Sequence, residues 1–244
     1  MMRNRSLPEL SAKDADYARS LVLHEDKSVI VFNKPAGLAV QGGGGVDRSL
    51  DDLLVAFAKS NGKKPRLVHR LDRGTSGVVI VGRTKPATAF LSEEFATRRA
   101  SKTYLALVEG PLPQSDTGLM EQSLVRVEEG GRPRMIVASP GRKGAQSAVT
   151  YWRVLARTDT HALMELKPET GRMHQIRIHL SASGSPILGD HLYGRGTKSA
   201  DRLMLHAAAL EIGHPDGGRV TYGAEVPDDF RAKAEALGLH SGLK

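Results

Sequence analysis

Cysteine is absent from the 244 residues of this sequence. The absence excludes structural disulfides, cysteine-based zinc sites and thiol nucleophiles together, and a reducing, cytoplasmic location is expected. Aromatic residues make up only 5% of the chain, too few for a platform on which long single strands of nucleic acid would stack. No apolar run approaches the ~20 residues that a membrane helix needs, and the first 20 residues lack the apolar core of a signal peptide. No membrane association is therefore expected.

Acidic residues are fewer than basic ones. The chain has 35 Lys and Arg against 27 Asp and Glu, a net charge of +8, which favours a polyanionic partner such as RNA. The 40% hydrophobic and 25% charged residues are typical of a globular chain, and this length can bury a sizeable core without disulfide or metal staples. No apolar stripe marks a dimer interface, so a monomer is expected.

The pattern of elements predicts an α+β fold. Helices and strands do not alternate strictly, which disfavours a doubly wound parallel sheet and favours a mixed, mainly antiparallel β-sheet flanked by helices and loops. Gly130-Gly131 and Pro140-Gly141 separate the expected strands between residues 119 and 166, and no repeat or long linker divides the chain. The clearest expected strands are 28–32, 78–81 and 102–109, and the clearest expected helices begin at Leu50, Pro86, Met173 and Asp228.

The densest group of reactive side chains is His69 to Gly77, with the sequence HRLDRGTSG. An acid, two arginines and two hydroxyls lie there between two apolar strands, where a rigid scaffold can hold them beside a cleft. The alternative is a solvated turn with a surface ion pair between Asp72 and an arginine, which base rates favour when the segment is taken alone.

A second group runs from Glu169 to Leu180. On a helix that begins near Met173, His174 and Arg177 share one face, and Gln175 and His179 share another. The alternative is a helix whose His and Arg side chains face solvent. A guanidinium beside Asp72 would hold that carboxylate ionised, but the sequence leaves open whether Asp72 and Arg177 meet.

The spacing of the residues does not support a zinc site, a serine hydrolase or a nucleotide-binding loop. His174 and His179 are five residues apart and miss the zinc-binding separation of four, so no metal site is expected. Ser76 does not lie in the G-x-S-x-G turn of serine hydrolases. The Gly-rich turn Gly42–Gly45 lacks the Lys-Ser/Thr ending of a P-loop and the spacing of a dinucleotide-binding loop.

Together these segments resemble the RluA family of pseudouridine synthases. His69-Arg70-Leu71-Asp72 followed by Thr75-Ser76-Gly77 is similar to the family's signature, and the resemblance extends from about Ser28 to Tyr222. The other similar motifs, in order, are Asn33 to Gly37, Lys102 to Glu109, Thr170 to His179, Gly189 to Gly194, and Leu205 to Ala207. The occurrence of all these motifs in the right order makes the resemblance specific.

The resemblance implies a pseudouridine synthase fold and isomerisation of uridine in RNA, without a metal or organic cofactor. It implies that Asp72 is the nucleophile, at the base or at the ribose, that Tyr104 stacks on the target base, and that Arg177 pairs with Asp72. Arg70 would occupy the space left by the flipped nucleotide. The expected target is 23S, large-subunit ribosomal RNA, with transfer RNA second. The further expected RNA contacts are Arg73, Lys102, Arg172, His174 and Gln175.

The resemblance also sets the expected domains. Residues 1–27 would be an N-terminal extension, too short for the small RNA-binding domain that many members carry, and residues 28–244 the catalytic domain. Two competing hypotheses remain. One is an RNA-binding or RNA-folding protein that uses the same basic surface without catalysis, and the other is a hydrolase built around Ser76.

Overall fold

The computed structural model describes residues 10–43 and 47–243. Residues 1–9 of the expected extension and part of the expected Gly42–Gly45 turn lie outside the described residues. The chain divides into two compact units. Unit 1 comprises the residues up to Ala100 together with Glu211–Ala224, and unit 2 comprises Ser101–Leu210 together with the residues from Glu225 onward. Each unit combines segments that are distant in sequence, which explains why no linker marks the division.

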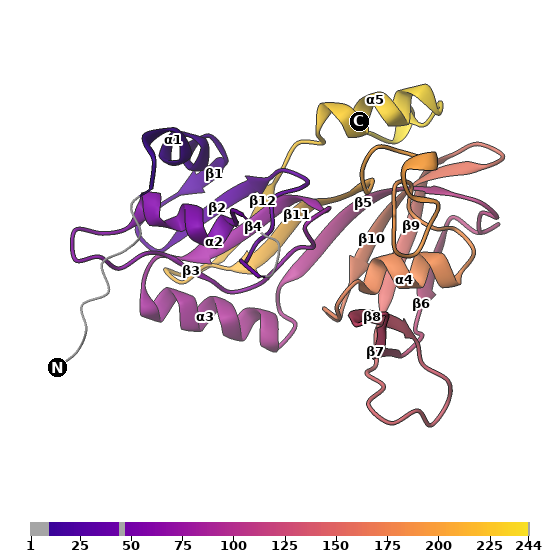
Figure 1. Cartoon of the computed structure of the whole chain (residues 1–244), viewed down its shortest axis with the longest axis horizontal. Coiled ribbons are helices and arrows are strands. Elements are labelled where there is room, and N and C mark those ends of the chain that lie inside the picture. The colour runs from indigo at the N-terminus through magenta and orange to yellow at the C-terminus, as the bar shows by residue number, and fades with distance from the viewer. Residues whose placement is uncertain (1–9, 44–46, 244) are drawn as a thin grey trace. The chain divides into compact units, whose positions relative to one another are not determined.

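Unit 1 is built on an antiparallel sheet in which β2 (Val29–Lys34) lies between β1 (Val22–Glu25) and β4 (Ser76–Gly82). All seven residues of β4 are buried. Strand β3 (Arg66–Leu67) pairs with the end of β4, and β12 (Arg219–Gly223) pairs with β11 (Leu205–Gly213), whose last three residues belong to this unit. The helices are α1 (Ala12–Ser20), α2 (Leu50–Leu53), the 3-10 helix η1 (Leu54–Phe57) and α3 (Lys85–Ala96), with α1 and α2 close together (Figure 1).

Unit 2 has the strand order β11-β5-β10-β9-β6, where β5 is Ser101–Glu109, β6 is Thr117–Met120, β9 is Thr150–Arg157 and β10 is His161–Pro168. Strand β10 is antiparallel to both β5 and β9, and β6 is antiparallel to β9. A separate antiparallel hairpin joins β7 (Leu124–Glu129) and β8 (Arg132–Val137). The helices are α4 (Gln175–Ala182), α5 (Asp228–Ala236) and the 3-10 helices η2 (Gly196–Lys198) and η3 (His240–Leu243).

These elements confirm the α+β fold and its mainly antiparallel sheet. Helix-capping residues in the sequence mark the starts of two helices correctly. Ser49 and Asp52 form a reciprocal capping box, and Thr84 caps α3 with Pro86 in its first turn. The helix expected from Leu50 is shorter than its pattern suggested, because it tightens into η1 after four residues. Helix α1 and strand β1 were not expected, and β1 pairs with β2 across the boundary proposed at residue 27.

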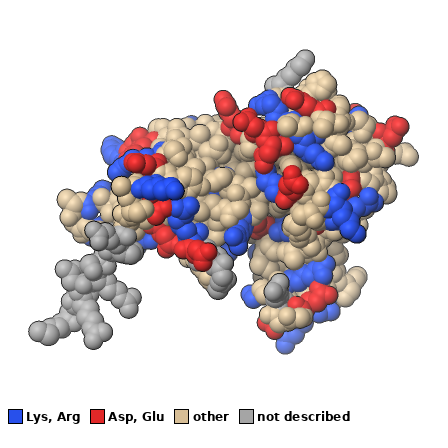
Figure 2. Space-filling model, turned by 45° about the horizontal axis from the view of Figure 1, so that its top comes forward, with Lys and Arg blue, Asp and Glu red and all other residues tan. Residues whose placement is uncertain are grey.

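Charged side chains are mixed on the face drawn in Figure 2, where Lys and Arg lie among Asp and Glu. The positive excess is therefore spread over that face rather than gathered in one patch. Within the described part of the chain, no helix has the length and apolar character to cross a membrane.

Candidate active site

A buried lysine braces the loop that carries Asp72. Lys34, at the end of β2, is fully buried, and its Nζ donates to the carbonyl oxygens of Leu38 at 2.8 Å, Pro35 at 3.0 Å and Arg73 at 3.3 Å. The Gly37 amide donates to the same Arg73 carbonyl at 2.8 Å, and Arg73 Nε donates back to the Gly37 carbonyl at 2.9 Å. The segments 34–38 and 72–75 are thus tied together by main-chain groups and one buried ammonium.

The Asp72 loop, residues 69–75, presents its acid from a fixed backbone. The Asp72 carbonyl accepts from the Thr75 amide at 3.0 Å, and the neighbouring Leu71 and Thr75 are buried while Asp72 itself is half-buried. His69 links the loop to β4 and to α3. Its Nε2 accepts from the Ile80 amide at 3.0 Å and its ring stacks on Phe95 with centroids 4.4 Å apart. The loop therefore enters strand β4 rigidly.

In unit 2, a closed hydrogen-bond network fixes the segment before α4. The Val149 amide donates to Thr170 Oγ1 at 3.0 Å, and Thr170 Oγ1 donates to Gln175 Oε1 at 2.7 Å. Gln175 Nε2 donates to Thr150 Oγ1 at 3.0 Å, which lies 2.9 Å from His179 Nδ1. His179 Nε2 lies 3.0 Å from the Gln122 carbonyl.

This network also constrains the protonation of His179. Because a carbonyl can only accept, Nε2 carries a proton, and in the neutral ring Nδ1 accepts from the Thr150 hydroxyl. Burial lowers the pKa of His179, and this outweighs the raising effect of the Gln122 carbonyl. Gln175 is 4% exposed, and its side chain is hydrogen-bonded within the protein, which gives it a role in holding the loop.

Arg177 forms a buried two-pronged ion pair with Asp190. Its Nε lies 2.8 Å from Asp190 Oδ2 and its Nη2 lies 2.7 Å from Oδ1. The side chains are 9% and 0% exposed. Asp190 Oδ1 also accepts from the Leu192 and Tyr193 amides at 2.9 and 3.1 Å. Burial raises the pKa of Asp190, but these bonds and the Arg177 charge outweigh it, so the pKa lies below its ordinary value.

Tyr193 packs against this ion pair. The Arg177 guanidinium lies 5.2 Å from the Tyr193 ring centroid, and the Tyr193 hydroxyl lies 2.9 Å from His174 Nδ1. His174 has a left-handed backbone with φ 54° immediately before α4. We call Arg177, Asp190, Tyr193 and His174 the α4 cluster. Gly189, which precedes the acid, has φ +74°, and a Cβ there would lie 1.8 Å from the Arg202 carbonyl oxygen. Only glycine fits this turn.

Two further predicted residues lie on β5. Tyr104 is half-buried, pairs with Leu166 of β10 and packs against the core of unit 2. Lys102 is half-buried, and its Nζ lies 3.7 Å from the position of a Cβ built on Gly171, next to Arg172. Burial lowers the pKa of Lys102. A half-buried ammonium beside the turn before α4 is well suited to receive an anion.

The remaining predicted RNA contacts are accessible. Arg70 and Arg73 are exposed on the Asp72 loop, and Arg172 is half-buried with its Nε donating to the Ser147 carbonyl at 3.1 Å. The structure therefore groups Asp72 with Arg70 and Arg73 in unit 1, and Tyr104 with the residues around α4 in unit 2. Lys34 and Asp190 were missed as site-organising residues, although both lie in motifs that carried the family resemblance.

One group of potential metal ligands lies elsewhere in unit 1. Ligand atoms of Asp26, His214 and Asp216 lie within 4.8 Å of one another. Asp26 Oδ2 meets the Nε2 atoms of His24 and His214 at 2.8 and 3.1 Å, while its Oδ1 accepts from two amides of the β1–β2 turn. Lys27 Nζ already lies 3.6 Å from Asp216. Hydrogen bonding within the protein accounts for this arrangement.

Comparison with known proteins identifies similar sequences and folds. The family model described as RNA pseudouridylate synthase matches residues 28–182. Ribosomal large subunit pseudouridine synthase D of Zymomonas mobilis is 36% identical over 227 residues, which cover 86% of this chain and 70% of that protein. Dual-specificity RNA pseudouridine synthase RluA of Yersinia pestis is 38% identical over 218 residues, which cover 88% of this chain and 99% of that protein.

A solved structure shares the fold as well. Human RNA Pseudouridylate Synthase Domain Containing 4 superimposes with a TM-score of 0.77 at 29% identity, covering 93% of this chain and 97% of that one. The similarity in sequence and in structure therefore extends over both units.

Proposed function

Because this chain belongs to the RNA pseudouridylate synthase family, we propose that it isomerises uridine in large-subunit ribosomal RNA and that Asp72 is its nucleophile. Support for the nucleophile is the Asp72 loop, which holds a half-buried carboxylate on a backbone braced by Lys34. Support for the RNA class is that similar proteins from Zymomonas mobilis and Xanthomonas campestris are named ribosomal large subunit pseudouridine synthases. Transfer RNA is the second candidate.

In the proposed reaction the bond between N1 of uracil and C1′ of ribose breaks, a bond from C5 to C1′ forms, C5 loses its proton and N1 takes one up, so that the product is an isomer of the substrate. Asp72 captures the base or the ribose and so divides one difficult step into easier ones. A base in folded RNA must first leave its stack, at a cost of roughly a few kcal/mol. Arg70, exposed two residues before Asp72, offsets part of that cost by filling the vacated space and meeting phosphate.

Arg177 is proposed to act as a positioning residue for Asp72. A guanidinium has five N–H donors, and Asp190 uses two of them in a geometry that fixes the plane of the group. The other N–H donors of Arg177 can therefore bind a second carboxylate, that of Asp72, while the ion pair with Asp190 stays in place. Tyr104 is proposed to stack on the detached uracil while it rotates, and Lys102, Arg172 and His174 to contact the RNA around it.

The decisive experiment maps pseudouridine by carbodiimide-blocked reverse transcription in ribosomal and transfer RNA, from cells with and without the gene. We expect a ribosomal signal to disappear in the deletion and to return with the wild-type gene but not with Asp72→Ala. If Asp72→Ala restores the signal, the nucleophile is assigned wrongly. If the signal that disappears is in transfer RNA alone, the ribosomal target is wrong.

A further inference from the structure

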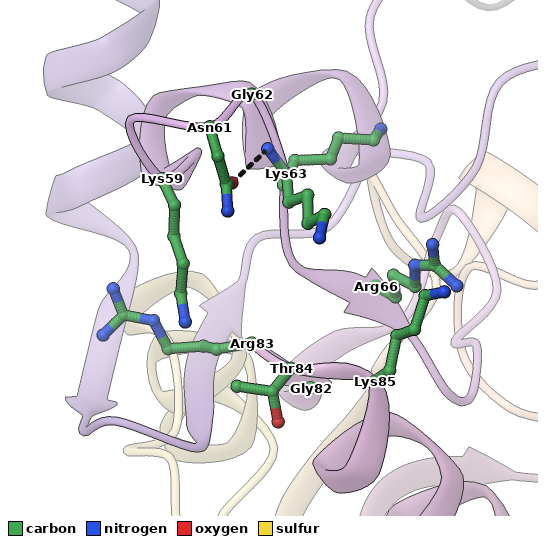
Figure 3. A pocket seen from close by; sticks show the side chains of 10 residues that line it. Lys59, Asn61, Gly62, Lys63, Arg66, Gly82, Arg83, Thr84 and Lys85 are labelled. Carbon is green, nitrogen blue, oxygen red and sulfur yellow. Dashed lines mark hydrogen bonds between the residues drawn. The ribbon is translucent and has the colours of Figure 1, made fainter.

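A second basic site lies in unit 1, outside the residues assigned to catalysis. A pocket of about 550 Å³ is lined by the loop after η1, by β3 and by the segment that leads into α3 (Figure 3). We call it the basic pocket; its lining residues are Lys59, Asn61, Gly62, Lys63, Lys64, Arg66, Gly82, Arg83, Thr84 and Lys85. Six of these ten side chains are cationic and none is acidic. Such a lining selects for an anion.

The charges of the basic pocket are only partly neutralised. Lys64 pairs with Asp51 at 3.0 Å, and Arg83 pairs with Glu25 at 2.8 Å. No carboxylate in residues 10–43 and 47–243 forms an ion pair with the other four cations, which are Lys59, Lys63, Arg66 and Lys85, all of them exposed. Four like charges held around one hollow repel each other, and an anion in the pocket would relieve that repulsion.

The backbone holds this arrangement in place. The amide of Lys59 donates to the Lys63 carbonyl at 3.0 Å, and the Lys63 amide donates to Asn61 Oδ1 at 3.1 Å. That bond leaves the Asn61 amide nitrogen as a donor, and Figure 3 shows it pointing down from the upper loop into the pocket. Arg66 and Lys85 line the pocket on the other side in this view. Cations and neutral donors therefore converge from three segments.

The basic pocket and the Asp72 loop lie at opposite ends of β4. Lys34, which braces the Asp72 loop, pairs with Gly77, whereas the pocket residue Gly82 pairs with Val29 and with Arg66 of β3. Five residue steps of a strand span roughly 17 Å. One nucleotide cannot occupy both places, so a ligand that reaches both must be an extended polyanion.

We propose that the basic pocket binds the phosphate backbone of the substrate RNA at a distance from the target uridine. The proposal rests on the proposed function, because it takes the ligand to be the same RNA. The lining contains no aromatic side chain on which a base could stack. Lys and Arg with one amide and one hydroxyl are the groups that contact phosphate and sugar, so the pocket contributes affinity and orientation rather than sequence recognition.

The test compares two triple variants of equal charge. The pocket variant carries Lys59→Gln, Lys63→Gln and Lys85→Gln, and the control variant carries Lys13→Gln, Lys198→Gln and Lys233→Gln, which lie outside the pocket. Each protein is titrated against a protein-free transcript of large-subunit ribosomal RNA, and against a short hairpin of that RNA with only the target uridine and its stem. A third titration uses inorganic pyrophosphate in place of RNA.

We expect the pocket variant to bind the long RNA about tenfold more weakly, with a salt slope reduced by about two, since each phosphate contact contributes ~0.7–0.9. Its affinity for the hairpin and its single-turnover rate on saturating hairpin should be unchanged. The proposal is overturned if the control variant loses as much affinity, if the long RNA binds equally well to the pocket variant, or if the hairpin is weakened as much as the long RNA.

Two outcomes separate this proposal from others. Pyrophosphate binding that the pocket variant loses, with long-RNA affinity unchanged, would make the pocket a small-anion site and overturn the RNA assignment. A wild-type protein that binds the RNA through the pocket but forms no pseudouridine in it would refute the proposed function and leave the pocket's ligand confirmed.

Discussion

The Asp72 loop of unit 1 and the α4 cluster of unit 2 hold their charged side chains in different ways. The loop is fixed through main-chain groups, with Lys34 Nζ and the Gly37 amide meeting the Arg73 carbonyl, so the backbone is rigid while the Asp72 side chain is half-buried. In the α4 cluster, the side chains hold each other, with Arg177 clamped to a fully buried Asp190.

The difference separates activity from stability. A half-buried side chain on a loop that the backbone braces can be changed with less effect on the fold than one half of a fully buried, two-pronged ion pair. Substitutions at Asp72 should therefore affect chemistry, and substitutions at Asp190 should affect the folded state.

The largest expected effect is on catalysis. Asp72→Ala should lower the single-turnover rate by on the order of 10⁴-fold or more, as loss of a nucleophile does elsewhere. The free energy of unfolding should fall by less than it does in Asp190→Ala, because Asp72 is half-buried whereas the Asp190 side chain is fully buried. Rapid-quench kinetics and urea unfolding measure the two quantities. An unfolding loss as large as that of Asp190→Ala would remove the contrast between the units.

The next effect is on the stability of unit 2. Asp190→Ala should destabilise the protein by about 3–5 kcal/mol, because Arg177 loses a fully buried carboxylate partner and the Leu192 and Tyr193 amides lose their acceptor. The matched control is the double variant Asp190→Asn with Arg177→Met, in which Asn still accepts from the Leu192 and Tyr193 amides. The double variant should unfold at higher urea than Asp190→Ala while remaining catalytically impaired. Equal midpoints would mean that the ion pair is not what stabilises the turn.

A buried cation in unit 1 sharpens the comparison. Lys34→Met should destabilise by about 2–3 kcal/mol, since carbonyls of Pro35, Leu38 and Arg73 lose a charged donor. It should also lower kcat through looser placement of Asp72, with KM changing less. Lys34→Arg would test whether any cation suffices, although the planar guanidinium of arginine does not match the three carbonyl oxygens that converge on the lysine ammonium. A Lys34→Met enzyme with normal kcat would contradict the bracing role.

The smallest effect is a pH dependence specific to unit 2. The pKa of buried His179 is lowered, so the unfolded chain takes up a proton before the folded one does. The protein should keep its full stability above the reference pKa of ~6.5 and lose at most about 1.4 kcal/mol per pH unit below it. His179→Gln keeps a donor for Gln122 and an acceptor for Thr150, and should flatten the profile between pH 7 and 5.5. An unchanged slope in thermal unfolding would exclude His179 as the cause.

Local patterns were sufficient for the elements whose signals lie in neighbouring residues. The start of α2 at Leu50, the start of α3 to within one residue of Pro86 and the buried β4 all follow from sequence spacing and composition. Helix α1 was missed because it is polar and has a single buried residue, Ala18, so its apolar period is weak. The 3-10 turn that ends α2 depends on packing that no local pattern encodes.

The sequence by itself determined the class of chemistry, since the absence of cysteine, the charge excess and the ordered motifs are all properties of the linear chain. Tertiary structure alone decided the partners of those residues. Lys34 and Arg73 are 39 positions apart, and Arg177 and Asp190 are 13 apart, yet each pair shares hydrogen bonds. Burial selects such partners, because a charge removed from water must be matched by whichever group the fold brings within reach.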